Sequence, residues 1–126
     1  MRNDVIIAVH DPSLRAAIRD VLDANGFRVI ATANGDELLA TLAAEAEVPS
    51  VVLIDLRRES AWSLVADVRR TGRFASLAII LISSWTEQDV VPEGVTVLAK
   101  PFRRAALLGA VGEHCRAREP AGEPDS

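Results

Sequence analysis

Three short, continuous runs of apolar residues constrain the fold of this 126-residue chain more than any other feature. They cover residues 5–9, 51–54 and 77–82 and are rich in β-branched side chains. Continuous runs of this kind are typical of strands that are covered on both faces, and each run is too short to form an ordinary helix. Two weaker and more alternating runs, at residues 27–31 and 95–98, predict two further strands nearer the edges of the same sheet.

Segments with helical spacing separate these runs. In the first, apolar residues recur every three or four positions, while Arg15, Arg19 and two aspartates occupy the other face. Asp11 is its expected N-cap, with Pro12 in the first turn. Three further helices are predicted from the leucine and valine positions in residues 34–48, in residues 64–70 and after residue 101.

Strand and helix thus alternate along the whole chain with short connections, which forces the strands to be parallel and places helices on both faces. The sequence predicts one α/β domain with a five-stranded parallel sheet, doubly wound and flavodoxin-like, with strand order 2-1-3-4-5. The domain is expected over residues 1–116, and residues 117–126, which lack large apolar side chains, are expected to be a disordered tail or linker. A stand-alone protein and a module of a longer one both fit this composition.

Charge and cysteine content narrow the class of protein. The chain contains 14 Lys plus Arg and 18 Asp plus Glu residues, and its net charge of -4 favours neither nucleic-acid nor membrane binding. The longest apolar runs fall well short of the roughly 20 residues that span a bilayer. A single cysteine, Cys115, cannot form an internal disulfide. We therefore expect a cytoplasmic protein.

The expected site lies at the carboxyl ends of the strands, where open parallel sheets bind their ligands. His10 and Asp11 follow the first predicted strand, Asp55 ends the third, Ser83 follows the fourth and Lys100 follows the fifth. A carboxylate can act as a nucleophile toward a phosphoryl group, and the acyl phosphate that results needs a cation and hydrogen-bond donors around its oxygens. Lys100 would supply the charge and Ser83 the hydroxyl.

At these positions the chain resembles the response-regulator receiver domain of two-component signalling, over residues 4 to about 116. The matching segments are VVLIDL at 51–56, ILISS at 80–84, KPF at 100–102 and DPSLR at 11–15. The resemblance implies that Asp55 is the phospho-acceptor, that Ser83 is the switch hydroxyl and that Lys100 contacts the phosphate. It also implies a cis peptide bond before Pro101, which an X-Pro bond tolerates cheaply.

The chain departs from the family pattern at the metal. Receiver domains usually end the first strand with two acids that hold Mg²⁺ together with the acceptor aspartate, and here Val9 and His10 occupy those positions. Asp55 and Asp11 are the remaining candidate ligands for Mg²⁺, although Asp11 is also needed as an N-cap. The segment 57–63 contains neither Pro nor Gly and is expected to be a loop with an altered course, and residues 85–94 leave room for about two helical turns.

Three functions remain open. In the first, a receiver domain accepts a phosphoryl group on Asp55 from a histidine kinase or phosphotransfer protein and signals to an effector protein or a fused output domain. The second is a pseudo-receiver that acts as a protein-interaction module without phosphorylation. Neither is an enzyme, and a homodimer through the fourth and fifth strands is a further expectation from the resemblance. A flavodoxin-type cofactor protein is disfavoured, because residues 10–13 contain no glycine to approach a phosphate.

Overall fold

A five-stranded parallel sheet forms the centre of the molecule. The computed structural model describes residues 4–83 and 94–117. The strands are β1 (Asp4–Val9), β2 (Arg28–Thr32), β3 (Val51–Asp55), β4 (Ala78–Ser83) and β5 (Val95–Ala99). Their order across the sheet is β2-β1-β3-β4-β5, which confirms the predicted topology. The two weaker runs are the edge strands β2 and β5, as their alternating pattern indicates.

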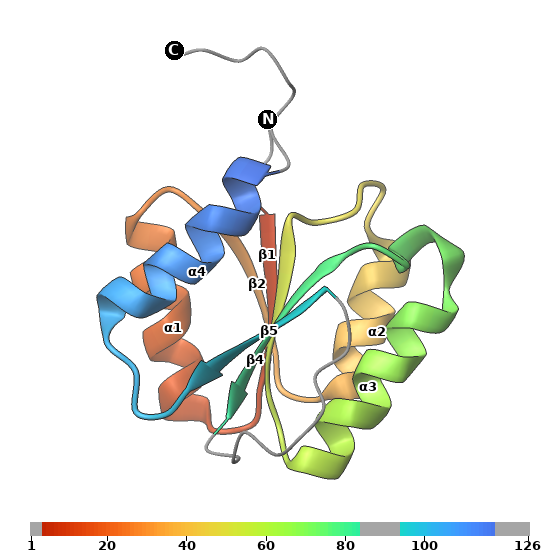
Figure 1. Ribbon diagram of the computed structural model, residues 1–126, viewed down its shortest axis with the longest axis horizontal. Coiled ribbons are helices and arrows are strands. Elements are labelled where there is room, and N and C mark those ends of the chain that lie inside the picture. The colour runs from red at the N-terminus through yellow and green to blue at the C-terminus, as the bar shows by residue number, and fades with distance from the viewer. Residues whose placement is uncertain (1–3, 84–93, 118–126) are drawn as a thin grey trace.

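Helices cover both faces of the sheet. They are α1 (Pro12–Ala24), α2 (Gly35–Ala44), α3 (Arg58–Arg70) and α4 (Arg104–Ala117), and a short 3₁₀ helix spans Gly72–Phe74. With the sheet seen nearly edge-on, α1 and α4 lie on one side of it and α2 and α3 on the other (Figure 1). The doubly wound arrangement is therefore confirmed. None of these helices is long and apolar enough to cross a membrane.

The central strands are buried on both faces, and their side chains divide between two cores. On β1, Ile6 and Ala8 pack toward α2 and α3, whereas Val5, Ile7 and Val9 pack toward α1 and α4. Strand β3 alternates in the same way, since residues 52 and 54 join the first core and residues 51 and 53 the second. Continuous apolar runs are thus explained by burial on both sides of a parallel sheet.

Two helices begin where the sequence predicts. The Asp11 carboxylate accepts the N–H of Ser13 and caps α1, with Pro12 in its first turn. The Asn34 side chain accepts the N–H of Glu37 and caps α2. These side chains satisfy backbone donors that the first turn of a helix leaves unpaired.

The expected loop at residues 57–63 is wrong, because α3 begins directly at Arg58. Only Leu56 and Arg57 separate β3 from this helix. Arg57 occupies the N-cap position without a side-chain hydrogen bond to the helix, so the usual sequence signal for a helix start is absent. The lack of Pro and Gly in this segment allows the helix to begin at its second residue, Arg58. Of the predicted helical turns in residues 85–94, all but Gly94 lie outside the described residues. The tail is predicted over residues 117–126, but Ala117 is the last residue of α4, and residues 118–126 lie outside the described residues.

Candidate functional site

Asp55 and Lys100 come together at the carboxyl edge of the sheet. Asp55 is the last residue of β3, and Lys100 directly follows β5, on the far side of β4. The Lys100 Nζ lies 2.9 Å from the Asp55 Oδ1, with the Asp55 side chain 11% exposed and the Lys100 side chain 38% exposed. A largely buried carboxylate is therefore held beside one ammonium group, which still reaches solvent.

Lys100 is the only lysine in the sequence, and each of the other basic residues among the 14 Lys plus Arg is an arginine. Lysine differs from arginine in carrying a compact point charge on a flexible stem. The peptide bond between Lys100 and Pro101 is cis, as the resemblance implies. The chain thus places its one lysine ammonium next to the carboxylate that ends the central strand.

Ser83 is placed by its backbone alone. It is the last residue of β4 and pairs in register with Ala99, the residue before Lys100. Its backbone therefore lies at the same edge of the sheet as Asp55 and Lys100. The position of its hydroxyl is outside what the structure describes, and the switch role stays a prediction.

The end of β1 lies next to Asp55 but places no acidic side chain beside it. Val9 pairs in register with Asp55 and is fully buried, and the backbone N–H of His10 donates to the Asp55 carbonyl oxygen over 3.2 Å. The His10 side chain borders a hollow of about 290 Å³ together with Leu56 and Arg57. The first strand thus contributes a backbone hydrogen bond and an apolar side chain at the positions expected to hold metal.

These residues do not fit the Mg²⁺ site that the resemblance implies. Mg²⁺ requires hard oxygen ligands in octahedral geometry. At this edge the Asp55 carboxylate already faces an ammonium group, Val9 is apolar, and the exposed Asp11 carboxylate caps α1. Within residues 4–83 and 94–117, no three His, Cys, Asp or Glu side chains form a group that could hold a metal ion. Metal ligation by Asp11 stays a prediction.

Arg15 reaches this edge, which sequence reasoning missed. It lies on α1, and its Nη1 donates to the carbonyl oxygen of Val9 over 2.9 Å and lies 3.5 Å from that of His10. Helical side chains lean toward the N-terminus of their helix, which brings this guanidinium back over the end of β1. In the sequence it is the last residue of the DPSLR segment and one more polar residue of the outer helical face, and neither pattern predicts its contact with the end of β1.

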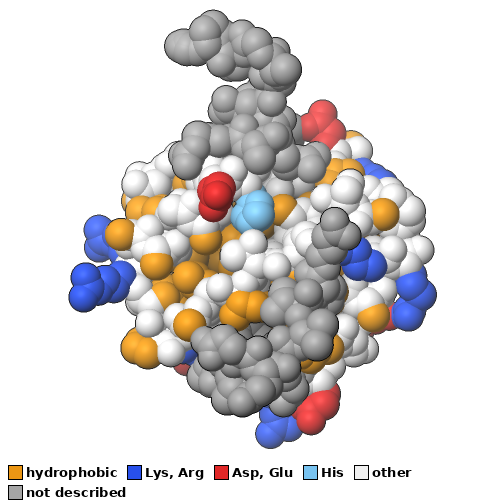
Figure 2. All heavy atoms as spheres, in the orientation of Figure 1, with side chains coloured by type: hydrophobic (Ala, Val, Ile, Leu, Met, Phe, Trp, Pro, Cys, Tyr) orange, Lys and Arg blue, Asp and Glu red, His pale blue; other side chains and the backbone are white. Residues whose placement is uncertain are grey.

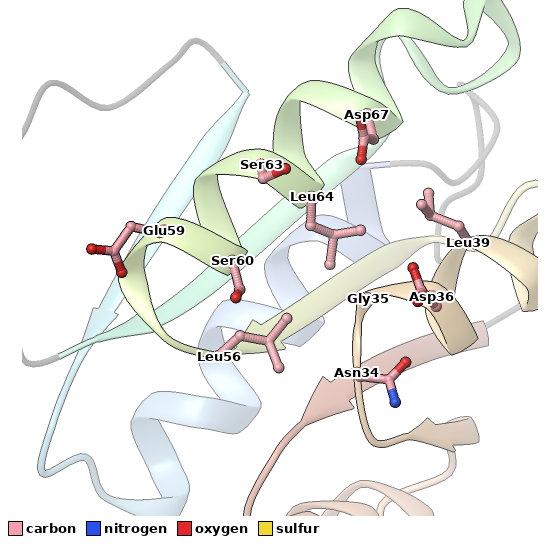
Figure 3. Close-up of a pocket in the computed structure, with 10 residues that line it drawn as sticks. All are labelled: Asn34, Gly35, Asp36, Leu39, Leu56, Glu59, Ser60, Ser63, Leu64 and Asp67. Atoms are coloured by element: carbon pink, nitrogen blue, oxygen red, sulfur yellow. The ribbon is translucent and has the colours of Figure 1, made fainter.

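A second hollow, of about 400 Å³, lies between α2 and α3, on the same side of the sheet as the hollow at His10 and on the opposite side from α1 (Figure 3). Leu64 points from α3 into the space between the helices, and Asp36, Glu59 and Asp67 are the acidic residues around it. Its charge suits no anion, which separates it chemically from the edge where Lys100 and Arg15 lie. On the face drawn in Figure 2, the described Lys and Arg side chains form no continuous patch, and most of them lie near its outline.

No protein-family model matches the sequence, and no curated protein matches it. Solved structures match over nearly the whole chain. The signal receiver domain of a signal transduction histidine kinase from Syntrophus aciditrophicus has a TM-score of 0.81 at 13% identity, covering 98% of this chain and 98% of that one. The chemotaxis response regulator CheY4 of Vibrio cholerae has a TM-score of 0.76 at 21% identity, covering 90% of this chain and 99% of that one.

A third match is the receiver domain of the sensor histidine kinase PA1611 from Pseudomonas aeruginosa PAO1, with a TM-score of 0.77 at 20% identity. It covers 90% of this chain and 97% of that one, and it has a magnesium ion coordinated in its active site cleft. The chain therefore has the flavodoxin-like, CheY-like fold of response-regulator receiver domains.

Proposed function

We propose that this chain is a receiver domain of phosphorelay signalling in which Asp55 accepts the phosphoryl group, with atypical or weak metal dependence. The observation that carries this proposal is the ion pair between Asp55 and Lys100, 2.9 Å long, at the carboxyl edge of the sheet. A carboxylate that is largely buried and still reaches solvent beside a cation has the surroundings that an acyl phosphate needs. Its proposed role is that of a signalling switch rather than an enzyme.

In the proposed step, an Asp55 carboxylate oxygen attacks the phosphorus of a phosphohistidine on a histidine kinase or phosphotransfer protein. The new O–P bond forms as the N–P bond breaks, and the histidine nitrogen keeps the electron pair and takes up a proton. Lys100 then transfers its contact from the carboxylate to the phosphoryl oxygens, where the negative charge has moved. This charge change at one edge of the sheet is the signal for an effector protein or a fused output domain.

The test uses phosphoramidate, a small donor whose transfer to a carboxylate releases ammonia and needs no kinase. We expect incubation with phosphoramidate and Mg²⁺ to add one phosphoryl group, detected by intact-mass measurement, and the Asp55→Asn variant to lose it. Asp20→Asn is the matched control, because that carboxylate is exposed on α1 and pairs only with Arg19 among the described residues. Equal labelling of Asp55→Asn and the parent protein would refute Asp55 as acceptor.

The second candidate is a pseudo-receiver that binds partners without being phosphorylated. Val9 favours it, because a fully buried valine replaces an acid beside Asp55. In that case phosphoramidate leaves the mass unchanged in a folded sample, with and without Mg²⁺. That result would reject the receiver proposal and leave the interaction module.

A further inference from the structure

The positive charge of Arg15 lies at the end of the strand next to Asp55. Its Nη1 donates to the carbonyl oxygen of Val9 over 2.9 Å, and Val9 is the register partner of Asp55 between β1 and β3. Lys100 approaches Asp55 from the opposite direction, since it follows β5 on the other side of β4. Two fixed cations therefore lie at the same edge of the sheet, one toward each side of β3.

Arg15 and the Asp55 side chain also belong to the same face of the sheet. Residues 51 and 53 of β3 pack into the core below α1 and α4, and Asp55 continues that alternation. Leu14, the neighbour of Arg15 on α1, lines one hollow of about 530 Å³ together with Lys100 and Phe102. The first turns of α1 thus border the segment that carries Lys100.

Among the described residues, the guanidinium has no acidic partner. No carboxylate in residues 4–83 and 94–117 lies within ion-pair distance of Arg15, whereas Arg19 pairs with Asp20 and Arg28 pairs with Asp4. Arg15 also lies near the N-terminus of α1, where the helix dipole disfavours a positive charge. A half-buried arginine held in such a place is suited to an anion that binds at this edge.

The two positive charges at this edge can offset the negative charge of an aspartyl phosphate without a metal ion. Such a group carries about two negative charges at neutral pH, which the ammonium of Lys100 and the guanidinium of Arg15 balance. In the pattern that the resemblance implies, two further acids need a divalent cation to offset them. Here Val9 and His10 bring no negative charge to that place.

Building on the proposed function, we infer that Arg15 and Lys100 together supply the positive charge at Asp55, so that its phosphorylation needs no divalent cation. The guanidinium of Arg15 is held by the backbone carbonyl oxygens of Val9 and His10, at the end of the strand where those two residues leave no acid to hold a metal. Arg15 acts as a positioning residue, through charge at the edge of the sheet.

The test compares phosphoramidate labelling in EDTA with labelling in Mg²⁺, for the parent protein and three variants. Arg15→Gln keeps an N–H donor for the Val9 carbonyl and removes the charge, whereas Arg15→Lys keeps the charge. Arg19→Gln is the control, because Arg19 lies one turn further along the same helix in an exposed pair with Asp20. Amide NMR spectra of each variant check that the fold is retained.

We expect the parent protein and Arg19→Gln to be labelled at the same rate in EDTA and in Mg²⁺. Arg15→Gln should be labelled roughly 10-fold more slowly, a smaller loss than for a donor that contacts the phosphoryl group, because Arg15 acts through its charge at a distance. Arg15→Lys should recover part of that loss, which a purely structural role would not allow.

Two outcomes overturn the inference while leaving the proposed function in place: labelling of Asp55 that requires Mg²⁺, or labelling in EDTA that is equally fast in Arg15→Gln. Absence of labelling at Asp55 under both conditions would overturn the proposed function and the inference together.

Discussion

At the scale of single residues, the lone lysine makes the site directly observable. Selective isotope labelling of lysine gives a single side-chain signal, because Lys100 is the only lysine. We expect this signal to shift when Asp55 is phosphorylated, since the Lys100 Nζ lies 2.9 Å from the Oδ1 of the Asp55 carboxylate. NMR spectra before and after phosphoramidate measure it. An unchanged signal in a sample with phosphorylated Asp55 would show that Lys100 does not contact the phosphoryl group.

Removing the lysine charge should slow the reaction. We expect Lys100→Met to lower the phosphorylation rate of Asp55 by roughly 100-fold, because the developing charge on the phosphoryl oxygens loses its cation. Arg103→Met is a suitable control, as this exposed residue lies three positions further along the chain. The rate of mass gain with phosphoramidate measures both. A Lys100→Met protein that reacts as fast as the control would contradict the proposed role.

Glycines at two turns should resist substitution, whereas one in a helix should not. Gly26 and Gly94 have φ of 91° and 83°, so alanine at either should destabilise the fold by about 1–2 kcal/mol. The two losses should be similar, because the close neighbour of a Cβ at Gly94 is the terminal nitrogen of the flexible Arg69 side chain, which can move, and nothing lies within 4 Å at Gly26.

Gly109 provides the opposite case, since it lies inside α4 and a Cβ added there would meet no neighbouring atom within 4 Å outside its own stretch of helix. Gly109→Ala should stabilise the protein by about 0.5–1 kcal/mol, because alanine favours the helical conformation. Urea unfolding of the three alanine variants gives the order. Destabilisation by Gly109→Ala that equals the effect at Gly26 would contradict the conformational explanation.

At the scale of elements, α2 has the clearest local signal for its start. The Asn34 side chain accepts the N–H of Glu37 over 2.9 Å, and the Glu37 side chain accepts the N–H of Ala33 over 2.8 Å. We expect Asn34→Ala to lower the free energy of unfolding by about 1 kcal/mol. Urea unfolding monitored by circular dichroism checks this. Unchanged stability would mean that packing, rather than the cap, fixes where α2 begins.

The helices also show why part of the fold was predictable and part was not. Asp11 and Asn34 predict the starts of α1 and α2, because Asp and Asn are preferred N-cap residues and each side chain caps its helix. Arg57, at the start of α3, makes no such bond, so the tertiary packing of Leu64 and Val68 fixes that helix instead. Capping residues in a sequence predict only helix starts that a local hydrogen bond fixes. A helix start that tertiary packing fixes, such as that of α3, has no such residue and cannot be predicted in this way.

The candidate site likewise contains residues whose positions could be predicted from the sequence and one whose position could not. Asp55 and Lys100 each follow a recognisable strand, so their convergence follows from the parallel sheet, and the structure brings them to 2.9 Å. Arg15 lies on the polar face of an amphipathic helix, where arginine is ordinary. Its role depends on which strand end the helix crosses, and no periodicity in the sequence contains that information.

At the scale of the whole molecule, burial should rank the strands by their importance. Ile7 on the interior strand β1 is fully buried, whereas Ile30 on the edge strand β2 is partly buried. Ile7→Ala should cost about 2–5 kcal/mol, and Ile30→Ala clearly less, because a solvent-facing site leaves a smaller cavity. Urea unfolding of both variants measures the difference. Equal losses would show that the edge strand is as essential to packing as the centre.

The strand order also determines the order in which the strands can pair while the chain is being synthesised. β1 leads the other strands along the chain, yet both of its neighbours, β2 and β3, come later, the second of them ending only at Asp55. During synthesis β1 can pair with β2 once residue 32 has been made, but its other edge stays without a partner strand until β3 ends at Asp55. Pairing between such distant segments is slow, because the loops between them must be closed first. The sheet is thus completed outward from β1, the first of the five strands along the chain.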